Sequence, residues 1–331
     1  MSGEARVKVA IIGAGWMARA GHCPSLREIE EVELAGICDV QQDKAEALAE
    51  SFGIPAAYAD YRAMLEEVAP DAVYVVIPAQ LVYDIMRHCL EAGLDVFVEK
   101  PPGITPNQTR IMAALAEAKG CKVQVGFNRR FVPLLVEARR RVEEQGPMHQ
   151  CEVTFYKDKR ASGEIGDPYH WGGCEAVYLE PIHAIDALRW LGGEPAVVHA
   201  AVRAVDADYP NTHAAIFEYE SGAVGILNHS WAAGGRMHTF QMHAVGASAY
   251  VEPGGSARIF TRGSKEPAVI TSQGAAGSDE FHRCEGFFAE SRHFIDCILK
   301  DEQPQPGLTD AVRTMELCDT ILRAGWNPEG R

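Results

Sequence analysis

The chain has 331 residues, a formal net charge of −15 at pH 7 and a hydrophobic content of 47%. This length exceeds one ordinary domain and predicts two, while the acidic balance argues against nucleic acid or an anionic membrane as a partner, since both require a basic face. The apolar stretches fall far short of the ~20 residues of a membrane span, and the first residues lack a signal-peptide pattern, which predicts a cytoplasmic protein.

The first element expected is a buried strand at residues 7–12 that turns at once into a helix. Its apolar, β-branched run leads into a G-x-G-x-x-A pattern, formed by Gly13, Ala14, Gly15, Trp16, Met17 and Ala18. In such a pattern the first glycine permits the turn, the second lets the backbone approach a pyrophosphate, and the third small residue lets helix and strand pack closely. The helix N-terminus would then face the anion.

A second apolar strand, expected at residues 32–38, ends in Asp39. An acid roughly 20 residues after the glycine turn is the residue type that binds the ribose hydroxyls of NAD. Its negative charge repels the 2′-phosphate of NADP, so the sequence predicts NAD as the cofactor, with NADP less favoured.

Strands and helices continue to alternate to about residue 126. Helices are expected at 42–52, 61–68, 82–92 and 107–119, and strands at 71–77, 94–98 and 122–125. This pattern predicts a doubly wound parallel sheet of the Rossmann type, in which ligands bind at the carboxyl ends of the strands. The nucleotide-binding residues predicted at those ends are Gly13, Ala14, Gly15, Trp16, Met17, Asp39, Ile77, Pro78, Glu99 and Lys100.

The pattern changes beyond residue 126. A helix at 132–144 precedes strands at 150–157, 197–205, 212–220, 223–231, 237–245 and 249–252, with further helices at 182–191, 285–300 and 309–324. These elements predict an α+β domain with a large, open, mostly antiparallel sheet. The expected division is therefore a Rossmann domain at 1–126 and a substrate-binding and oligomerisation domain at 127–331.

Large apolar residues occupy both faces of the predicted second sheet. Ile216 and Ile226 alternate with Phe217 and Leu227, so they point to opposite sides. Because helices of one domain cover a single face, the other face is expected to pack against a second copy of the chain. The sequence thus predicts a homodimer or a homotetramer.

Two residues are candidates for catalysis. Lys100 follows Glu99 and precedes Pro101 at the end of a buried strand, where loss of water lowers a lysine pKa and favours hydrogen bonding to a developing alkoxide. His183 lies near the start of the helix expected at 182–191, and a histidine is a natural proton acceptor for an alcohol.

The segment between residues 157 and 174 holds a basic run and an aromatic group. The run from Lys157 to Arg160 reads as a solvated surface, whereas Tyr169, His170 and Trp171 either offer a flat face to a sugar ring or pin the loop. No metal is predicted, because His282 and Cys284 lack flanking ligands and suit a structural role. The nine cysteines form no C-x-x-C pair and are expected as reduced thiols.

Several of these motifs together resemble the Gfo/Idh/MocA oxidoreductases, which include glucose-fructose oxidoreductase and inositol 2-dehydrogenase. The resemblance rests on the glycine turn, Asp39, Leu90-Glu91-Ala92-Gly93 before the Glu99-Lys100-Pro101 segment, residues 125–131, and His183-x-x-Asp186. It implies a Rossmann domain followed by an open-sheet domain, and hydride transfer between NAD or NADP and a secondary hydroxyl of a sugar, polyol or cyclitol. It further implies that Lys100 is the catalytic lysine, that His183 is the acid/base, and that Asn128 and Arg129 border the cofactor and substrate pocket.

The chain departs from the family pattern at two positions. Leu179 stands where the family usually has Asp or Asn, with Glu180 beside it, and Val82 stands where the family often has histidine. Either Glu180 replaces the missing carboxylate in contacting substrate, or the substrate differs from the common cyclitols. Two alternatives therefore stay open: an enzyme that uses NAD transiently to cleave glycosides or epimerise, and a catalytically silent NAD-binding regulator.

Overall fold

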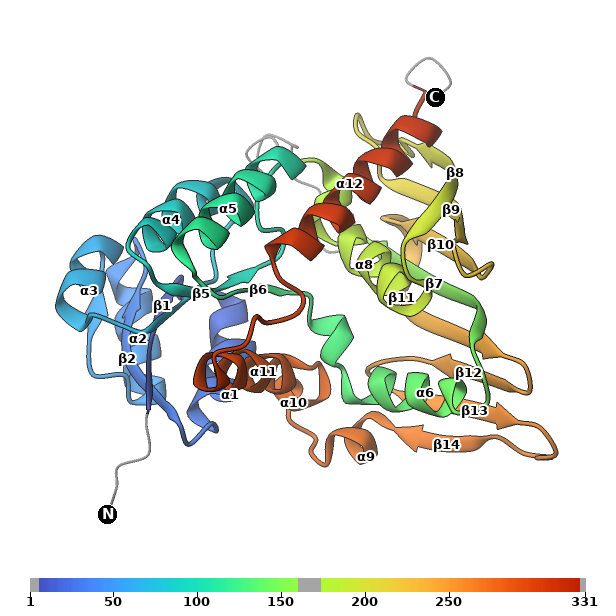
Figure 1. Cartoon of the computed structure of the whole chain (residues 1–331), viewed down its shortest axis with the longest axis horizontal. Coiled ribbons are helices and arrows are strands. Elements are labelled where there is room, and N and C mark those ends of the chain that lie inside the picture. Colours follow the sequence, from blue (N-terminus) through green and yellow to red (C-terminus); the bar gives the residue numbers. More distant parts are fainter. Residues whose placement is uncertain (1–5, 160–173, 328–331) are drawn as a thin grey trace. The chain divides into compact units, whose positions relative to one another are not determined.

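Six parallel strands, in the order β3-β2-β1-β4-β5-β6, form the first of two sheets in the computed structural model, which describes residues 6–159 and 174–327 (Figure 1). The strands are β1 (Val7–Ile12), β2 (Val32–Cys38), β3 (Ala57–Tyr58), β4 (Ala72–Val75), β5 (Asp95–Glu99) and β6 (Val123–Gly126). The strand order reverses between β1 and β4, which creates a switch point at the carboxyl ends of these two strands. The predicted doubly wound sheet is confirmed.

Helices cover both faces of this sheet (Figure 1). They are η1 (Ala18–His22), α1 (Cys23–Arg27), α2 (Gln42–Phe52), α3 (Tyr61–Val68), α4 (Ala79–Glu91), α5 (Pro106–Lys119), α10 (Phe281–Cys284) and α11 (Phe287–Lys300). Local signals set their ends: the Thr105 side chain accepts a hydrogen bond from the Gln108 amide at the start of α5, and Gly120 adopts a left-handed conformation at its end. The helix after the glycine turn opens as a π-helical segment, η1, before continuing as α1.

The division of the chain differs in one respect from the expected boundary at residue 126. One unit consists of Met1–Asn128 with Glu280–Val312, and the other of Arg129–Asp279 with Arg313–Arg331. Helix α11, expected in the second domain, instead buries Phe294 and Ile295 in the core beneath the parallel sheet. Its apolar face therefore completes one side of the Rossmann unit.

The second unit is built on an eight-stranded sheet in the order β14-β13-β12-β11-β7-β10-β9-β8. Only β10 and β7 run parallel, so the predicted mostly antiparallel sheet is confirmed. Its strands are β7 (Met148–Asp158), β8 (Pro195–Arg203), β9 (Thr212–Tyr219), β10 (Val224–Ser230), β11 (Ala232–Ala244), β12 (Ala247–Val251), β13 (Ser256–Thr261) and β14 (Ala268–Thr271). Strands β13 and β14 extend the sheet beyond the predicted set.

Helices of the second unit cover one face of this sheet. They are α6 (Pro133–Glu143), α7 (Ala176–Leu179), α8 (Pro181–Gly192), α9 (Ser272–Ala276) and most of α12 (Leu308–Gly325), after the short 3-10 helix η2 (Asn128–Phe131). Along β9, Phe217 is fully buried whereas Ile216 is 48% exposed. This alternation leaves Ile216 exposed on the opposite face of the sheet, beside the polar side chain of Glu218.

Within residues 6–159 and 174–327, no helix combines the length and the apolar character needed to cross a bilayer. The cytoplasmic location stays a prediction. The nine cysteines are all free thiols, and all but Cys284 are buried, as expected for residues that fill the core.

Candidate functional site

A pocket of about 610 Å³ opens at the carboxyl ends of β1, β2 and β4. Its lining brings together the glycine turn, the acid after β2 and the segment after β4: Ile12, Gly13, Gly15, Cys38, Asp39, Val40, Gln41, Lys44, Ala59, Asp60, Tyr61, Val76, Ile77, Pro78, Leu81 and Ile85. The three segments are far apart in sequence, and the parallel sheet places their ends side by side. This is the crevice expected at the switch point of the fold.

The glycine turn has the two properties expected from its sequence. Gly13 has a φ of +107°, its amide donates to the Cys38 carbonyl at 2.7 Å, and a Cβ added there would lie 2.1 Å from the Val76 carbonyl oxygen. A Cβ at Gly15 would meet nothing within 4 Å. Gly13 is therefore required by the close approach of backbones, and Gly15 leaves room for a ligand.

The carboxylate of Asp39 is held in place by two backbone amides. The Ala14 amide donates to Oδ2 at 2.8 Å and the Gln41 amide donates to Oδ1 at 2.9 Å. Each carboxylate oxygen keeps further acceptor capacity, so the bonds fix the orientation of Asp39 while leaving it able to bind hydroxyl groups. Lys44 lines the same pocket.

Other predicted cofactor residues take varied positions around the turn. Ile77 and Pro78 line the pocket, and Ala14 is buried beside it. Trp16 is 62% exposed, with its ring edge-on to Phe281 at 5.3 Å between centroids, while Met17 packs against the core. Neither Trp16 nor Met17 contributes to the lining of the pocket.

Cys38 also lines the pocket but carries no reactive thiolate. Burial, followed by the nearby Asp60 and Asp39 carboxylates, raises the pKa of its thiol to about 11. The thiol therefore stays protonated near neutral pH and acts as a small apolar group.

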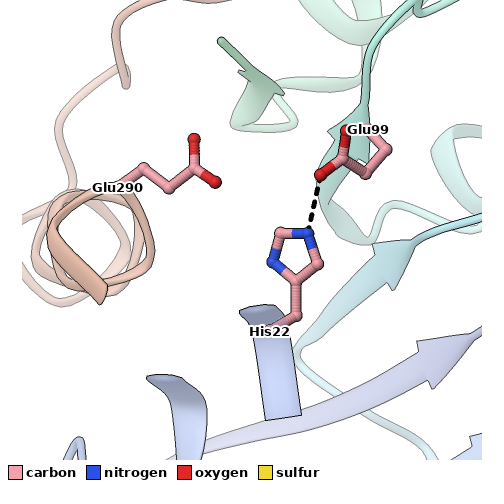
Figure 2. A group of neighbouring side chains, drawn as sticks. All are labelled: His22, Glu99 and Glu290. Atoms are coloured by element: carbon pink, nitrogen blue, oxygen red, sulfur yellow. Dashed lines mark hydrogen bonds and ion pairs between the residues drawn. The ribbon is translucent and has the colours of Figure 1, made fainter. Parts of the chain in front are cut away.

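The segment at the end of β5 places Glu99 inside the unit and Lys100 just beyond the strand. Glu99 is 8% exposed; its Oε1 lies 2.8 Å from His22 Nε2, and its Oε2 accepts a hydrogen bond from the Lys100 amide at 3.1 Å (Figure 2). Lys100 is half-buried. Asn128, after β6, is also buried, and its side-chain amide donates to the Glu285 carbonyl at 2.9 Å.

His183 belongs to the second unit, in the first turn of α8. The helix begins at Pro181, and the His183 amide donates to the Glu180 carbonyl at 3.1 Å. The His183 side chain is half-buried, whereas most of the helix around it is buried. The local fold thus sets His183 at a helix start, as predicted.

Lys157, on β7, and Lys159, just after the end of that strand, hold the side chain of Glu180. Lys157 Nζ lies 3.0 Å from Oε1, and Lys159 Nζ lies 3.6 Å from Oε2 and 4.1 Å from the centre of the Trp231 ring. The interpretation of this basic run as solvated is wrong for these two lysines, whose side chains are only 16% and 8% exposed. The two lysines are two positions apart at the end of β7, and both ammonium groups reach the Glu180 carboxylate.

Asp186 forms part of a buried network within the second unit. Its carboxylate accepts two hydrogen bonds from the Arg130 guanidinium, at 2.8 and 2.6 Å, and one from Thr314 at 2.9 Å. Arg189 donates to the same Thr314 hydroxyl at 2.6 Å. In the His183-x-x-Asp186 motif the aspartate therefore joins α8 to η2 and α12. Arg129, next to Arg130, is 9% exposed.

Three predicted substrate residues, Tyr169, His170 and Trp171, lie outside the described residues, as does Arg160. Sequence reasoning did not identify His22, Lys157 or Lys159 as parts of these clusters. Each owes its partner to the tertiary fold: His22 and Glu99 are 77 positions apart, and Lys157 and Glu180 are 23 apart. No periodic pattern marks contacts of this kind.

Family models match both parts of the chain. The oxidoreductase family with an NAD-binding Rossmann fold (GFO_IDH_MocA) matches residues 7–127, and the GFO/IDH/MocA C-terminal domain matches residues 136–252. The chain belongs to the Gfo/Idh/MocA family. The resemblance read from the motifs is confirmed, and with it an NAD-binding Rossmann domain in an oxidoreductase family.

Curated members of the family include dehydrogenases of sugars and cyclitols. The chain is 34% identical over 199 residues to D-glucoside 3-dehydrogenase of Escherichia coli, a match that covers 58% of the chain and only 55% of that protein. It is 23% identical to scyllo-inositol 2-dehydrogenase (NAD(+)) of Bacillus subtilis, over 95% of the chain and 92% of the relative.

Solved structures of similar fold include levoglucosan dehydrogenase in complex with NADH and levoglucosan. It superposes with a TM-score of 0.84 at 19% identity, and the match covers 96% of this chain and 97% of that one. A likeness at this identity establishes a shared fold over nearly the whole chain.

Proposed function

We propose that this Gfo/Idh/MocA protein is an NAD-dependent dehydrogenase acting on a secondary hydroxyl, or the corresponding ketone, of a sugar, polyol or cyclitol. The observation that carries the proposal is the pocket at the switch point, where the glycine turn and the anchored carboxylate of Asp39 share one lining. The named activities of the relatives supply the substrate class.

The residues at the pocket fit a dinucleotide. The open space above Gly15 suits a pyrophosphate, and the fixed Asp39 carboxylate suits two ribose hydroxyls. NAD, when bound, supplies the hydride acceptor for oxidation of the carbinol carbon. The backbone of Trp16 and Met17 and the side chains of Ile77 and Pro78 would border it, and Glu99 and Asn128 would support it from within the unit.

Lys100 and His183 would have different roles toward the reacting oxygen of the substrate. We assign to the Lys100 ammonium the stabilisation of negative charge on that oxygen, because such charge grows in the transition state. We assign to the His183 imidazole the acceptance of the hydroxyl proton. Both assignments follow from family membership applied to the matching positions.

Substrate contacts are proposed for Arg129, Tyr169, His170, Trp171 and Glu180. Glu180 replaces the carboxylate or amide that the family carries at the position of Leu179. The ion pairs with Lys157 and Lys159 support this role, because they fix the direction of the Glu180 side chain one helical turn before His183.

A panel of sugars and polyols tests the proposal against its two alternatives. Growth of NADH absorbance with a matching ketone product supports a dehydrogenase. Product formed without net NADH indicates transient oxidation, as in a glycosidase or an epimerase. NAD binding without turnover on any member of the panel indicates a silent regulator and contradicts the proposal.

Cofactor choice should depend on Asp39. We expect NAD to bind more tightly than NADP in the wild type, because the Asp39 charge repels the 2′-phosphate. Asp39→Ala should reduce the difference between the two affinities, because NAD would bind more weakly and NADP more tightly. Lys44 lines the same pocket and would attract the 2′-phosphate once the Asp39 charge is removed. Dissociation constants from quenching of protein fluorescence measure both effects.

The double variant Asp39→Ala/Lys44→Met provides the control. It should lose the gain in NADP affinity but retain the loss in NAD affinity, since only the lysine charge attracts the phosphate. Tighter NADP than NAD binding in the wild type would contradict the assignment.

We also propose a homodimer or homotetramer formed through the exposed face of the eight-stranded sheet. Ile216 of β9, Tyr250 of β12 and Phe260 of β13 are 48%, 38% and 38% exposed on the strands of this sheet. Light scattering at micromolar concentration should give a molecular mass that is a multiple of the 36.1 kDa chain mass. Ile216→Lys should lower the measured mass, because it places a charge in the proposed interface. A wild-type mass of one chain would refute the assembly.

A further inference from the structure

A histidine and a glutamate meet inside the first unit directly before Lys100. His22, the last residue of η1, places Nε2 at 2.8 Å from Oε1 of Glu99, the last residue of β5. Their side chains are 0% and 10% exposed, so the pair is shielded from water. Figure 2 shows a second carboxylate, that of Glu290 on α11, pointing toward the pair from the other side.

Aromatic rings fix the imidazole of His22. The rings of Tyr74, Phe97 and Phe287 stand edge-on to it, with centroids at 5.6, 5.0 and 5.4 Å. Gly21 allows this closeness, because a Cβ there would lie only 2.9 Å from the Phe287 ring. The imidazole therefore has one orientation, and that orientation aims Nε2 at Glu99.

The Glu99 carboxylate connects the His22 imidazole to the backbone amide of Lys100. One of its carboxylate oxygens faces His22, and the other accepts the hydrogen bond from the Lys100 amide at 3.1 Å. We propose that His22 is a positioning residue for Lys100 and acts through the carboxylate of Glu99. The inference rests on the catalytic role proposed for Lys100.

The nearby carboxylate of Glu290 explains why Glu99 needs His22 as a hydrogen-bond partner. One ligand-type atom from each of His22, Glu99 and Glu290 lies within 4.8 Å of the other two, and Glu290 is fully buried. Two buried carboxylates repel each other when both are ionised, and a hydrogen-bond donor on Glu99 offsets that cost. Without the donor, the Glu99 carboxylate would turn away from Glu290 and would release the Lys100 amide.

The same three residue types can also bind a divalent metal. The geometry favours a direct hydrogen bond over a metal ion. His22 Nε2 and Glu99 Oε1 are at hydrogen-bond distance, and aromatic rings surround the imidazole. A metal at this position is therefore an outcome that the experiment must detect.

Kinetics of three variants of the full chain test the proposal. His22→Met removes the donor and should lower kcat about 10-fold while changing the Kd for NAD by less than about 3-fold, since misplacing a reacting group costs rate. His22→Gln restores an N–H donor at similar reach and should recover kcat to within about 3-fold of the wild type. The control is His282→Met, which breaks another pair between a buried histidine and a glutamate, Glu28 at 2.9 Å, and should leave kcat unchanged.

A second readout follows the Lys100 amide without relying on turnover. Lys100 is the only lysine in the chain that follows a glutamate, so labelling glutamate with ¹³C at the carbonyl and lysine with ¹⁵N isolates its amide signal. That signal should shift upfield in His22→Met, because the hydrogen bond to a carboxylate is weakened, and return in His22→Gln. It should stay in place in His282→Met.

Three results would overturn the proposal: an unmoved Lys100 signal in His22→Met, a loss of kcat no larger than that of His282→Met, or one equivalent of metal that copurifies with wild type and is lost in His22→Met. Failure of the proposed function is distinguishable from these results. If the proposed function is wrong, Lys100→Met should keep full turnover. The Lys100 amide signal in the His22 variants would still report whether His22 positions the Lys100 backbone.

Discussion

Lys100→Met should lower turnover on the true substrate by about 10²-fold or more, with the Kd for NAD within a few-fold of wild type. In the role proposed for Lys100, the ammonium stabilises negative charge that develops on the substrate oxygen, and that charge is largest in the transition state. Methionine keeps the length and apolar stem of lysine without its charge. Stopped-flow or steady-state NADH absorbance gives kcat, and fluorescence titration gives the Kd.

A second lysine of the same unit provides the matched control. The Lys122 side chain is 13% exposed, and its Nζ lies 2.7 Å from Asp301. Lys122→Met removes a lysine charge from the same unit, together with its ion pair, and should leave kcat unchanged. Equal turnover losses in the two variants would mean that Lys100 acts through stability rather than chemistry.

His183→Ala should also lower turnover by about 10²-fold and should flatten the acidic limb of the pH–rate profile. Only a neutral imidazole accepts the hydroxyl proton, so in the role proposed for His183 its protonation should inhibit the wild-type oxidation as the pH falls. Removing the imidazole removes that titration along with most of the rate. Initial rates across a pH series, at saturating substrate and NAD, measure both effects.

His199 is the comparison for this variant. It lies on β8 of the same unit, and its side chain is 63% exposed and paired with Glu218 at 3.1 Å. His199→Ala should preserve both the rate and the shape of the profile. An acidic limb that persists in His183→Ala would show that another group accepts the proton.

Local sequence patterns are sufficient to predict the parallel sheet of the Rossmann unit and the pocket at its switch point. Helices α2 and α3 have the bounds that were predicted, and the residues at the carboxyl ends of β1, β2 and β4 line one pocket. These features follow from local signals: β-branched runs, amphipathic helices, and glycines that a turn requires. The carboxyl ends of parallel strands then meet without further information.

The residues that are distant in sequence and complete these clusters are identified by the three-dimensional packing alone. The amide of Gln124 binds the Glu290 carbonyl across 166 positions and draws α11 into the first unit, where the sequence had indicated the second. Likewise, nothing near His22 in the sequence indicates Glu99 as its partner, and nothing near Glu180 indicates Lys157 and Lys159. Such contacts depend on how complete elements pack, and a residue's local sequence carries no periodic record of its long-range neighbours.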